Sequence, residues 1–563
     1  MLKSITRGLL ARIELVAYLL AIWSFVVLFM ESVISFYADF SIVEHLTALA
    51  NILLLFLTII NRLITREPGK GNNLLIFDGS MLALGTLLFF FDAKFVIFFL
   101  LIRQTWYILE FFLFKAFEGR FFKQLTANPP ATLMLSFALV ISIGTILLMM
   151  PAASSSNQVT NIVDALFTAT SATCVTGLTV VDTGSHFSFF GQLVILVLIQ
   201  IGGLGIMTIS TAFAIMLGQR ITLKLESVMY DVVGGSQSLN VLQLLKSIVL
   251  ATLLIESLGA VLLYTRFSAH YLPLEAFYMS VFHSVSAFCN AGFSLMSENM
   301  MGYVSDIVMN LGITFLIILG GLGFTVIVDL NRYLFYRERV KKLSLHSKIV
   351  LITTGSLLLL GVVTFYWAEY YGTMEGFTIA KRLLASWFQS VTTRTAGFNT
   401  IDTSVLSKAS ILITLALMFI GASPGSTGGG IKTTTFAVLS LSITSLLKGK
   451  RELSIFNRKI PSTNFREATS LITLSAAIIF VILFLLLLVE PFPFDKLFFE
   501  AVSAFGTVGL STGITPLLSQ TGKVLITLLM YVGRIGPLTM IYALAIKRHV
   551  INLDYAEEKI AIG

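Results

Sequence analysis

Long runs of apolar residues, separated by short polar stretches, extend over almost the whole chain. A helix needs about 20 mostly apolar residues to cross a bilayer, so these runs predict membrane-spanning helices. Four of them precede residue 128, at 9–30, 45–61, 74–92 and 95–117. The first follows basic residues, and no small-residue cleavage site comes after it. We therefore interpret it as a membrane helix rather than a cleaved leader.

After a break at Asn128-Pro129-Pro130, one pattern repeats four times. Each unit has a long apolar segment, a shorter half-apolar segment that ends in a polar glycine motif, and a second long apolar segment. The first long segments lie at 131–150, 241–264, 348–367 and 467–490, and the second at 189–217, 307–330, 408–446 and 519–546. The repetition predicts an extension at 1–125 followed by units at 126–235, 236–345, 346–462 and 463–563.

The basic residues indicate how the chain is oriented. The stretches 331–348 and 448–466 each hold six basic residues and one acid, so both are expected on the cytoplasmic side. The same rule places both termini in the cytoplasm, after four spans in the extension and two in each unit. Each half-apolar segment then enters the membrane from the outside and returns.

Composition supports a multi-pass membrane protein. Of 563 residues, 56% are hydrophobic and only 12% are charged, whereas about 25% are charged in a soluble domain. This excludes a water-soluble fold, a disordered chain and a nucleic-acid binder with a basic patch. Two cysteines exclude a disulfide framework. The net charge of +8 is explained by basic cytoplasmic loops.

The four glycine motifs align without gaps. They are the eight-residue stretches 171–178, 286–293, 391–398 and 503–510, each with glycine in the seventh place and Leu or Phe in the eighth. The glycines are Gly177, Gly292, Gly397 and Gly509. Single glycines of this kind commonly allow close helix packing. Four in register, each between two long spans, instead favour one repeated functional element.

A pore for a dehydrated cation would explain that element. A ring of backbone carbonyls can replace the water shell of an ion, and glycine readily adopts the positive φ that turns carbonyls toward an axis. Irregular backbone at membrane depth is tolerated where it lines a pore. The predicted ion-binding residues are Val175, Thr176, Gly177, Asn290, Ala291, Gly292, Thr395, Ala396, Gly397, Thr507, Val508 and Gly509. Asn290 departs from the Val or Thr of the other copies and could weaken symmetry or selectivity.

These motifs resemble the Trk/Ktr/HKT superfamily of potassium transporters, and specifically the bacterial TrkH/KtrB-type membrane subunit. The resemblance covers about 125–550 and rests on 128–130, 176–178, 290–293, 394–400 and 507–513. It implies an all-α fold with four M1–pore helix–M2 repeats around a pseudo-fourfold pore. It also implies a homodimer and a separate cytoplasmic nucleotide-binding subunit of the RCK type. Glycine at all four filter positions implies a preference for potassium, since sodium-selective plant members carry serine in place of Gly177.

The second long segment of the third unit is interrupted by polar and flexible residues. It contains Gly425, Ser426, Thr427, Gly428, Gly429, Gly430 and Lys432. Glycine costs about 1 kcal/mol and proline about 3 kcal/mol inside a helix, so we expect an intramembrane loop below the filter. A nucleotide-binding P-loop is rejected because Ile431 separates Gly430 from Lys432. The resemblance identifies this stretch as a gating loop and places Arg534 beside it. We expect Arg534 to hold the loop closed and to repel cations; snorkelling of its side chain to the cytoplasm is the alternative.

Other polar residues support weaker interpretations. Cys174 and Cys289 occupy one repeat position and are interpreted as small residues packed behind the filter rather than a redox pair. Arg394 could pair with Asp402 or Glu298. Asp182 and Asp402 either attract cations to the outer mouth or form surface turns. A relay through Asp78, Glu110 and Glu256 is an alternative to pairing with neighbouring helices.

Together these features predict potassium uptake across the plasma membrane, the inner membrane of a bacterial cell, without a cofactor and without nucleic acid. The first alternative is a sodium-permeable or Na⁺- or H⁺-coupled transporter of the same family. The second is a polytopic membrane enzyme, which would need a cluster of catalytic polar residues; none stands out in the sequence.

Overall fold

The protein is described from a computed structural model that covers Trp23, 41–64, 79–83, Thr86, 129–205, 241–335, 342–450 and 452–544. Of the predicted spans in the extension, 45–61 lies within helix α2 (Ser41–Ile64). The span at 9–30 apart from Trp23, the span at 95–117 and most of 74–92 lie outside the described residues, as do Asp78 and Glu110.

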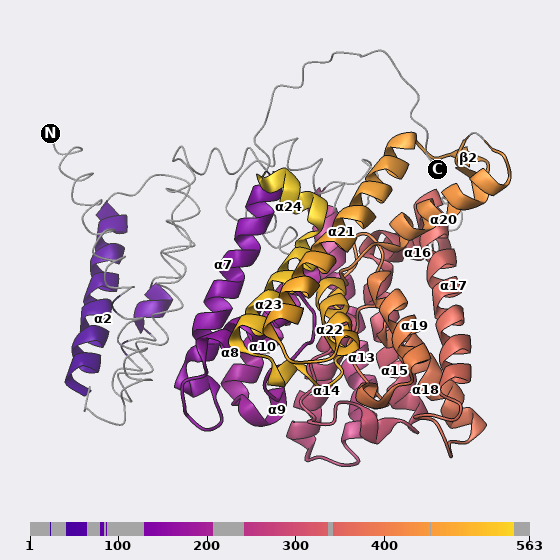
Figure 1. The fold of residues 1–563 in the computed structure, drawn as a ribbon. Coiled ribbons are helices and arrows are strands. Elements are labelled where there is room, and N and C mark those ends of the chain that lie inside the picture. Colours follow the sequence, from indigo (N-terminus) through magenta and orange to yellow (C-terminus); the bar gives the residue numbers. More distant parts are fainter. Residues whose placement is uncertain are drawn as a thin grey trace.

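Helices build the four predicted units in sequence order (Figure 1). The first contains α7 (Pro129–Met149), α8 (Ile162–Thr173) and α10 (Phe189–Leu204), and the second α13 (Val241–Phe267), α14 (Pro273–Phe288), α15 (Ile307–Leu322) and α16 (Phe324–Phe335). The third contains α17 (Leu345–Ala368), α18 (Ile379–Thr392), α19 (Lys408–Phe419) and α20 (Thr433–Leu447), and the fourth α21 (Ser462–Val489), α22 (Phe494–Gly506), α23 (Gln520–Ile535) and α24 (Pro537–Leu544).

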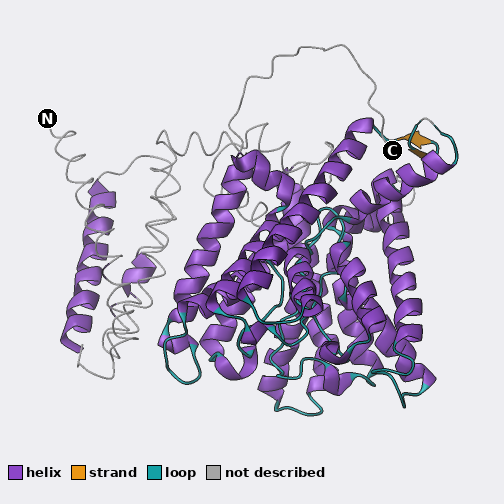
Figure 2. Ribbon diagram, viewed as in Figure 1, coloured by secondary structure: helices purple, strands orange, loops and turns teal. Residues whose placement is uncertain are grey.

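The remaining elements are short. They are η2 (Pro151–Ala153), α9 (Thr183–His186), η3 (Met301–Tyr303), η4 (Thr403–Val405), η5 (Thr515–Leu517), and the antiparallel strands β1 (Ser454–Ile455) and β2 (Arg458–Lys459). Figure 2 shows this hairpin beside a body of helices, with loops running through its centre. The all-α fold class is confirmed.

Four helices of the described residues are long and apolar enough to cross a membrane alone: 130–149, 247–267, 345–368 and 462–489. They correspond to the first long segment of each unit. Apolar side chains such as Leu258, Val261, Phe480 and Leu488 are exposed on them. Lipid tails are as apolar as these side chains, so the exposure suits helices that face the bilayer.

The second long segments differ from the expectation of mostly continuous spans. α15 and α16 are bent by 101° at Gly323, and α23 and α24 by 90° at Gly536. α10 ends at Leu204, and Gly205 follows it as the capping residue. These glycines have φ of +92°, +90° and +79°, a conformation that a right-handed helix cannot continue. In the third unit the break is a whole segment, from Ile420 to Lys432.

Hydroxyl and carboxylate caps fix where the second segments begin. Ser188, Asp306, Ser407 and Ser519 each accept a hydrogen bond from a backbone N–H in the first turn of α10, α15, α19 and α23. Such caps satisfy amide groups that the helix itself leaves without an acceptor. Each unit therefore turns back toward the centre at a defined residue.

Candidate ion pathway

The four glycines of the repeated motif meet in one ring. A Cβ atom built on Gly292 would lie 2.6 Å from the carbonyl oxygen of Ala396, and one on Gly397 would lie 2.6 Å from that of Val508. The corresponding neighbours of Gly177 and Gly509 are the carbonyl oxygens of Ala291 and Thr176. Each glycine thus faces the residue before the next glycine, and the fourth unit returns to the first. These contacts close a ring. The sequence alone showed that the four motifs align, but not that they meet.

The backbone of the ring has the same unusual conformation four times. Val175, Asn290, Thr395 and Thr507 have φ of 57°, 60°, 68° and 49°, and the glycine two residues later has φ between 70° and 92°. β-branched residues rarely adopt a positive φ. Strain of this kind persists only where the surroundings enforce it, typically at functional sites. The repetition indicates that the ring is formed by a shared backbone conformation rather than by shared side chains.

Hydroxyl groups hold the ring from behind. Ser171 and Ser503 accept hydrogen bonds from the backbone N–H groups of Gly177 and Gly509, at 3.0 and 3.2 Å. In the other two units the hydroxyl donates instead: Ser286 to the Phe293 carbonyl at 2.8 Å, and Thr392 to the Phe398 carbonyl at 2.5 Å. The sequence analysis missed this role, although serine occupies the first place of three aligned motifs.

Asn290 does not disturb the ring. Its backbone φ matches the other three units. With the oxygen and nitrogen of its side-chain amide exchanged, so that each faces a suitable partner, the nitrogen donates to the carbonyl oxygens of Ala287 and Ile317 at 3.2 and 3.1 Å. Because these carbonyls belong to α14 and α15, the polar group is satisfied behind the filter. The backbone at Asn290 therefore follows the fourfold pattern that its polar side chain was expected to weaken.

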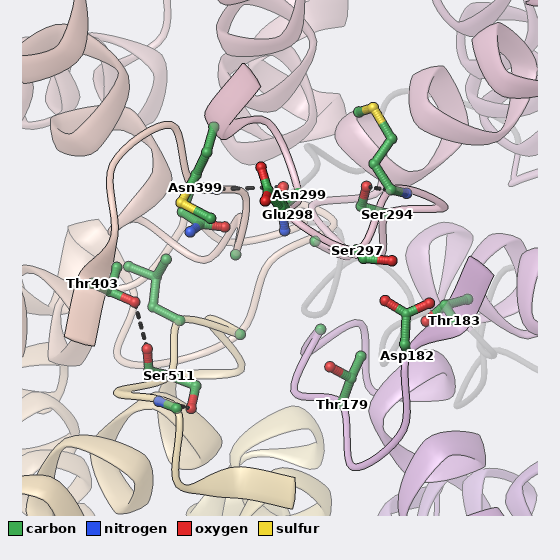
Figure 3. Close-up of a pocket in the computed structure, with 18 of the residues that line it drawn as sticks. Thr179, Asp182, Thr183, Ser294, Ser297, Glu298, Asn299, Asn399, Thr403 and Ser511 are labelled. Atoms are coloured by element: carbon green, nitrogen blue, oxygen red, sulfur yellow. Dashed lines mark hydrogen bonds between the residues drawn. The ribbon is translucent and has the colours of Figure 1, made fainter. Parts of the chain in front are cut away.

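A polar cavity of about 320 Å³ opens above the ring. All four filter glycines line it, together with residues of the loops that follow them, including Thr179, Asp182, Ser297, Glu298, Asn399, Asp402, Thr403 and Ser511. Figure 3 shows these loops meeting around the cavity. Neighbouring units are joined there: Met300 N–H donates to the Asn399 carbonyl at 3.1 Å, and the Thr403 hydroxyl to the Ser511 carbonyl at 2.5 Å.

Two carboxylates in this cavity also cap short helices. Asp182 caps α9 and Asp402 caps η4 through backbone N–H groups. Partial burial of Asp182 would raise its pKa, but hydrogen bonds from Ser185 and Ser297 outweigh that effect and lower it. Both alternatives of the sequence analysis are thus compatible: these residues shape turns and also line the mouth.

The interrupted segment of the third unit lies directly beneath the ring. The Thr427 hydroxyl donates to the Phe288 carbonyl at 3.2 Å, and the Thr427 N–H donates to the Gly320 carbonyl at 3.2 Å. Cβ atoms built on Gly428 and Gly429 would meet the hydroxyls of Thr395 and Thr507. The segment therefore contacts the second, third and fourth units. Glycine is needed here because a side chain would strike the filter.

Two cations hold this segment. Both are partly buried, and both bind backbone carbonyls. The Arg534 guanidinium donates to the carbonyl oxygens of Thr427 and Gly202, and Lys432 Nζ donates to the Gly428 carbonyl at 2.7 Å. Arg534 lies in the last turn of α23, before the break at Gly536. Its side chain binds inside the protein, which contradicts the snorkelling alternative.

Other singled-out residues lie close to the filter. Cys174 and Cys289 are free and fully buried. Glu256 accepts a hydrogen bond from Gln200 at 3.2 Å and faces Cys289, so it pairs with a neighbouring helix. Within the described residues, Arg394 forms no ion pair with Asp402 or Glu298; it donates to the Gly421 carbonyl at 3.4 Å.

Comparison with known proteins places these features in a family. Residues 108–550 match the TrkH family, described as "Cation transport protein". The chain is 42% identical to the Ktr system potassium uptake protein B of Bacillus subtilis, covering 79% of this chain and 99% of that protein. It is 38% identical to the potassium/sodium uptake protein NtpJ of Enterococcus hirae, covering 77% and 97%.

A solved structure shares the fold. The potassium transporter TrkH of Vibrio parahaemolyticus superposes with a TM-score of 0.60 at 17% identity, covering 90% of this chain and 99% of that one. Because the family match extends over most of the chain and includes every residue of the ring and of the segment beneath it, the protein belongs to the TrkH family of cation transport proteins.

Proposed function

We propose that this chain takes up potassium through the central ring. The observation that carries the proposal is the closed order of contacts between each filter glycine and the next unit. The relatives' names, both of which include potassium uptake, support the choice of ion. Family and relatives are transporters, so transport rather than catalysis is the function.

Potassium binds, in this proposal, to backbone carbonyls of 175–177, 290–292, 395–397 and 507–509. Four strands with alternating positive φ present carbonyl oxygens to one axis, where they replace the hydration shell of the ion. The polar cavity above collects the cation. Below, Thr427 to Gly430 block the axis, while Lys432 and Arg534 add positive charge that raises the barrier to a cation.

Opening requires the blocking segment to leave the ring. The bonds that hold it are few and mostly to backbone carbonyls, so displacement of 425–430 exchanges them for water. The break at Gly323 adjoins this segment: the Phe324 N–H donates to the Gly425 carbonyl at 3.0 Å. Movement of α16 would therefore reach the segment directly.

The remaining expectations belong to the same proposal. The chain is divided into the extension 1–125 and the units 126–235, 236–345, 346–462 and 463–563, with both termini in the cytoplasm. It works as a homodimer with a separate RCK-type cytoplasmic subunit. The words "Ktr system" in the name of the Bacillus subtilis relative support a multi-component transporter.

Sodium is the alternative cargo, since one relative is named a potassium/sodium uptake protein. The test is rubidium-tracer uptake into liposomes that contain the purified chain, with K⁺ or Na⁺ as competitor. K⁺ alone should compete in the wild type. Gly177→Ser should lose that preference, because a side chain there meets the Ala291 carbonyl and widens the ring.

Equal competition by Na⁺ in the wild type would contradict the potassium assignment and leave the pore intact. Absence of flux would require repetition with the cytoplasmic subunit. Silence under both conditions would contradict the pore itself.

A further inference from the structure

A small cavity lies behind the filter of the third unit. It has a volume of about 20 Å³, room for one water-sized particle. Residues of α15, α17 and α18, of the turn after α18 and of the segment after α19 line it: Ile317, Ile318, Gly321, Thr354, Leu358, Val391, Arg394 and Ala422. It is separate from the ion pathway, since no residue that lines it lines the outer cavity.

Arg394 brings an unbalanced positive charge to this cavity. Its side chain is 7% exposed, and its Nε atom has no hydrogen-bond partner among the described residues. The bond to the Gly421 carbonyl, at 3.4 Å, is long. No described carboxylate lies within ion-pair distance. A buried charge is costly unless it is paired, so the guanidinium needs a counter-ion.

Thr354 offers a second donor to the same space. It is 7% exposed, and its hydroxyl has no partner among the described residues. Threonines inside helices commonly donate to the carbonyl four residues earlier, as Thr364 of the same helix does to Leu360 at 2.8 Å. Thr354 does not, so its hydroxyl remains available.

We propose that this cavity binds a single halide ion, chloride under physiological conditions, between the Arg394 guanidinium and the Thr354 hydroxyl. Two donors, one of them cationic, and an otherwise largely apolar lining suit a monovalent spherical anion. A water molecule would also fit the space, but it would leave the charge of Arg394 without a counter-charge at membrane depth.

The site has a mechanical consequence. Arg394 directly precedes filter residue Thr395 and donates to Gly421, and Ala422 lines the cavity. A halide would therefore bind between the filter of the third unit and the start of the blocking segment. This role goes beyond the proposed potassium pathway and does not depend on it.

The test uses the full-length protein and bromide as the probe. Crystals soaked in bromide should show an anomalous peak within hydrogen-bonding distance of Arg394 Nε. In solution, chloride should raise the melting temperature above that in gluconate at equal ionic strength by about 2–4 °C. Thr354→Val removes one donor at nearly constant shape, and Thr364→Val is the matched control on the same helix.

The chloride response should fall below about 1 °C in Thr354→Val and persist in Thr364→Val. An empty anomalous map with ordered water beside Arg394 would mean that the cavity holds water, and would overturn the proposal. An equal chloride response in both variants would overturn it as well. Neither readout requires ion flux, so failure here is distinguishable from failure of the transport proposal.

Discussion

The ring of filter glycines and the layer beneath it are built from the same four units, but the units are alike in the ring and differ in the layer below. In the filter, all four contribute the same backbone conformation and the same glycine. In the layer below, the second and fourth units bend at a glycine and α10 of the first unit ends at one. Among the described residues, the third unit alone inserts a segment, Ile420 to Lys432, beneath the ring.

The difference follows from what each layer must do. An ion on the axis touches every unit at once, so selective coordination needs equal ligands on all sides. Blocking the axis needs one obstacle, and four would compete for the same space. In the proposed function, symmetry is therefore retained where the ion would bind and lost where it would be stopped.

The largest effect is expected from a substitution at one of the four filter glycines, which would make one unit of the ring unlike the others. Gly292→Ala places a methyl group 2.6 Å from the Ala396 carbonyl at φ +70°, so both strain and collision displace the backbone. We expect rubidium flux to fall about 100-fold, equivalent to about 2.7 kcal/mol in the barrier. Gly302→Ala is the control, because nothing lies within 4 Å of its Cβ. Flux within twofold of wild type would mean that ions pass elsewhere.

The lower layer should respond in the opposite direction. Arg534→Ala removes the donor to Thr427 and Gly202 and a positive charge from the axis. We expect basal rubidium flux to rise about 10-fold, which corresponds to a barrier lowered by about 1.4 kcal/mol. Arg466→Ala, at an exposed position of α21, should leave flux unchanged. Unaltered flux in a folded Arg534→Ala protein would remove Arg534 from the gate.

The sequence predicted the symmetric layer better than the asymmetric one. Register, glycine spacing and hydropathy repeat four times, so the four motifs of the ring can be aligned from the sequence alone. Closure of the ring could not be predicted, because contacts such as that between Gly509 and Thr176 join segments more than 300 residues apart.

The breaks at Gly205 and Gly323 show another limit. Three residues before each of them, Gly202 and Gly320 pack against the carbonyls of Thr173 and Phe288. The same short motif also holds the residue with positive φ, and hydropathy does not distinguish a bent span from a straight one. In the third unit, a proline and consecutive glycines mark the interruption in the sequence, and in the fourth unit Pro537 directly follows Gly536 at the bend.

A third experiment tests the contact between the fourth unit and the first, which are not consecutive in the sequence. There Lys523 Nζ binds Asp164 at 2.7 Å, with 13% and 22% of the two side chains exposed. A double-mutant cycle with Lys523→Met and Asp164→Asn should give a coupling of about 1 kcal/mol in thermal unfolding.

The exposed pair of Lys459 and Glu452 provides the control, since its side chains are 63% and 59% exposed. Its coupling should stay below about 0.5 kcal/mol, because solvent screens it. Equal coupling for both pairs would mean that the joint between the fourth and first units gains nothing from its ion pair.

The smallest effect is expected at the outer mouth, where symmetry is already imperfect. Asp182→Asn removes one negative charge from the cavity above the ring and should lower rubidium uptake about twofold at low ionic strength, with the effect lost at high salt. Glu275→Gln, exposed in the first turn of α14 and outside the cavity lining, is the control. An equal effect of both would assign the loss to general surface charge.

The pH dependence follows from the lowered pKa of Asp182. A carboxylate whose pKa is depressed by folding keeps its charge above that value, and its contribution to stability and to cation attraction is lost only as the pH falls through it. The ratio of wild-type to Asp182→Asn uptake should therefore stay constant between about pH 8 and 5. A ratio that declines within this window would show that the hydrogen bonds from Ser185 and Ser297 do not hold the charge, and that the mouth attracts cations through other groups.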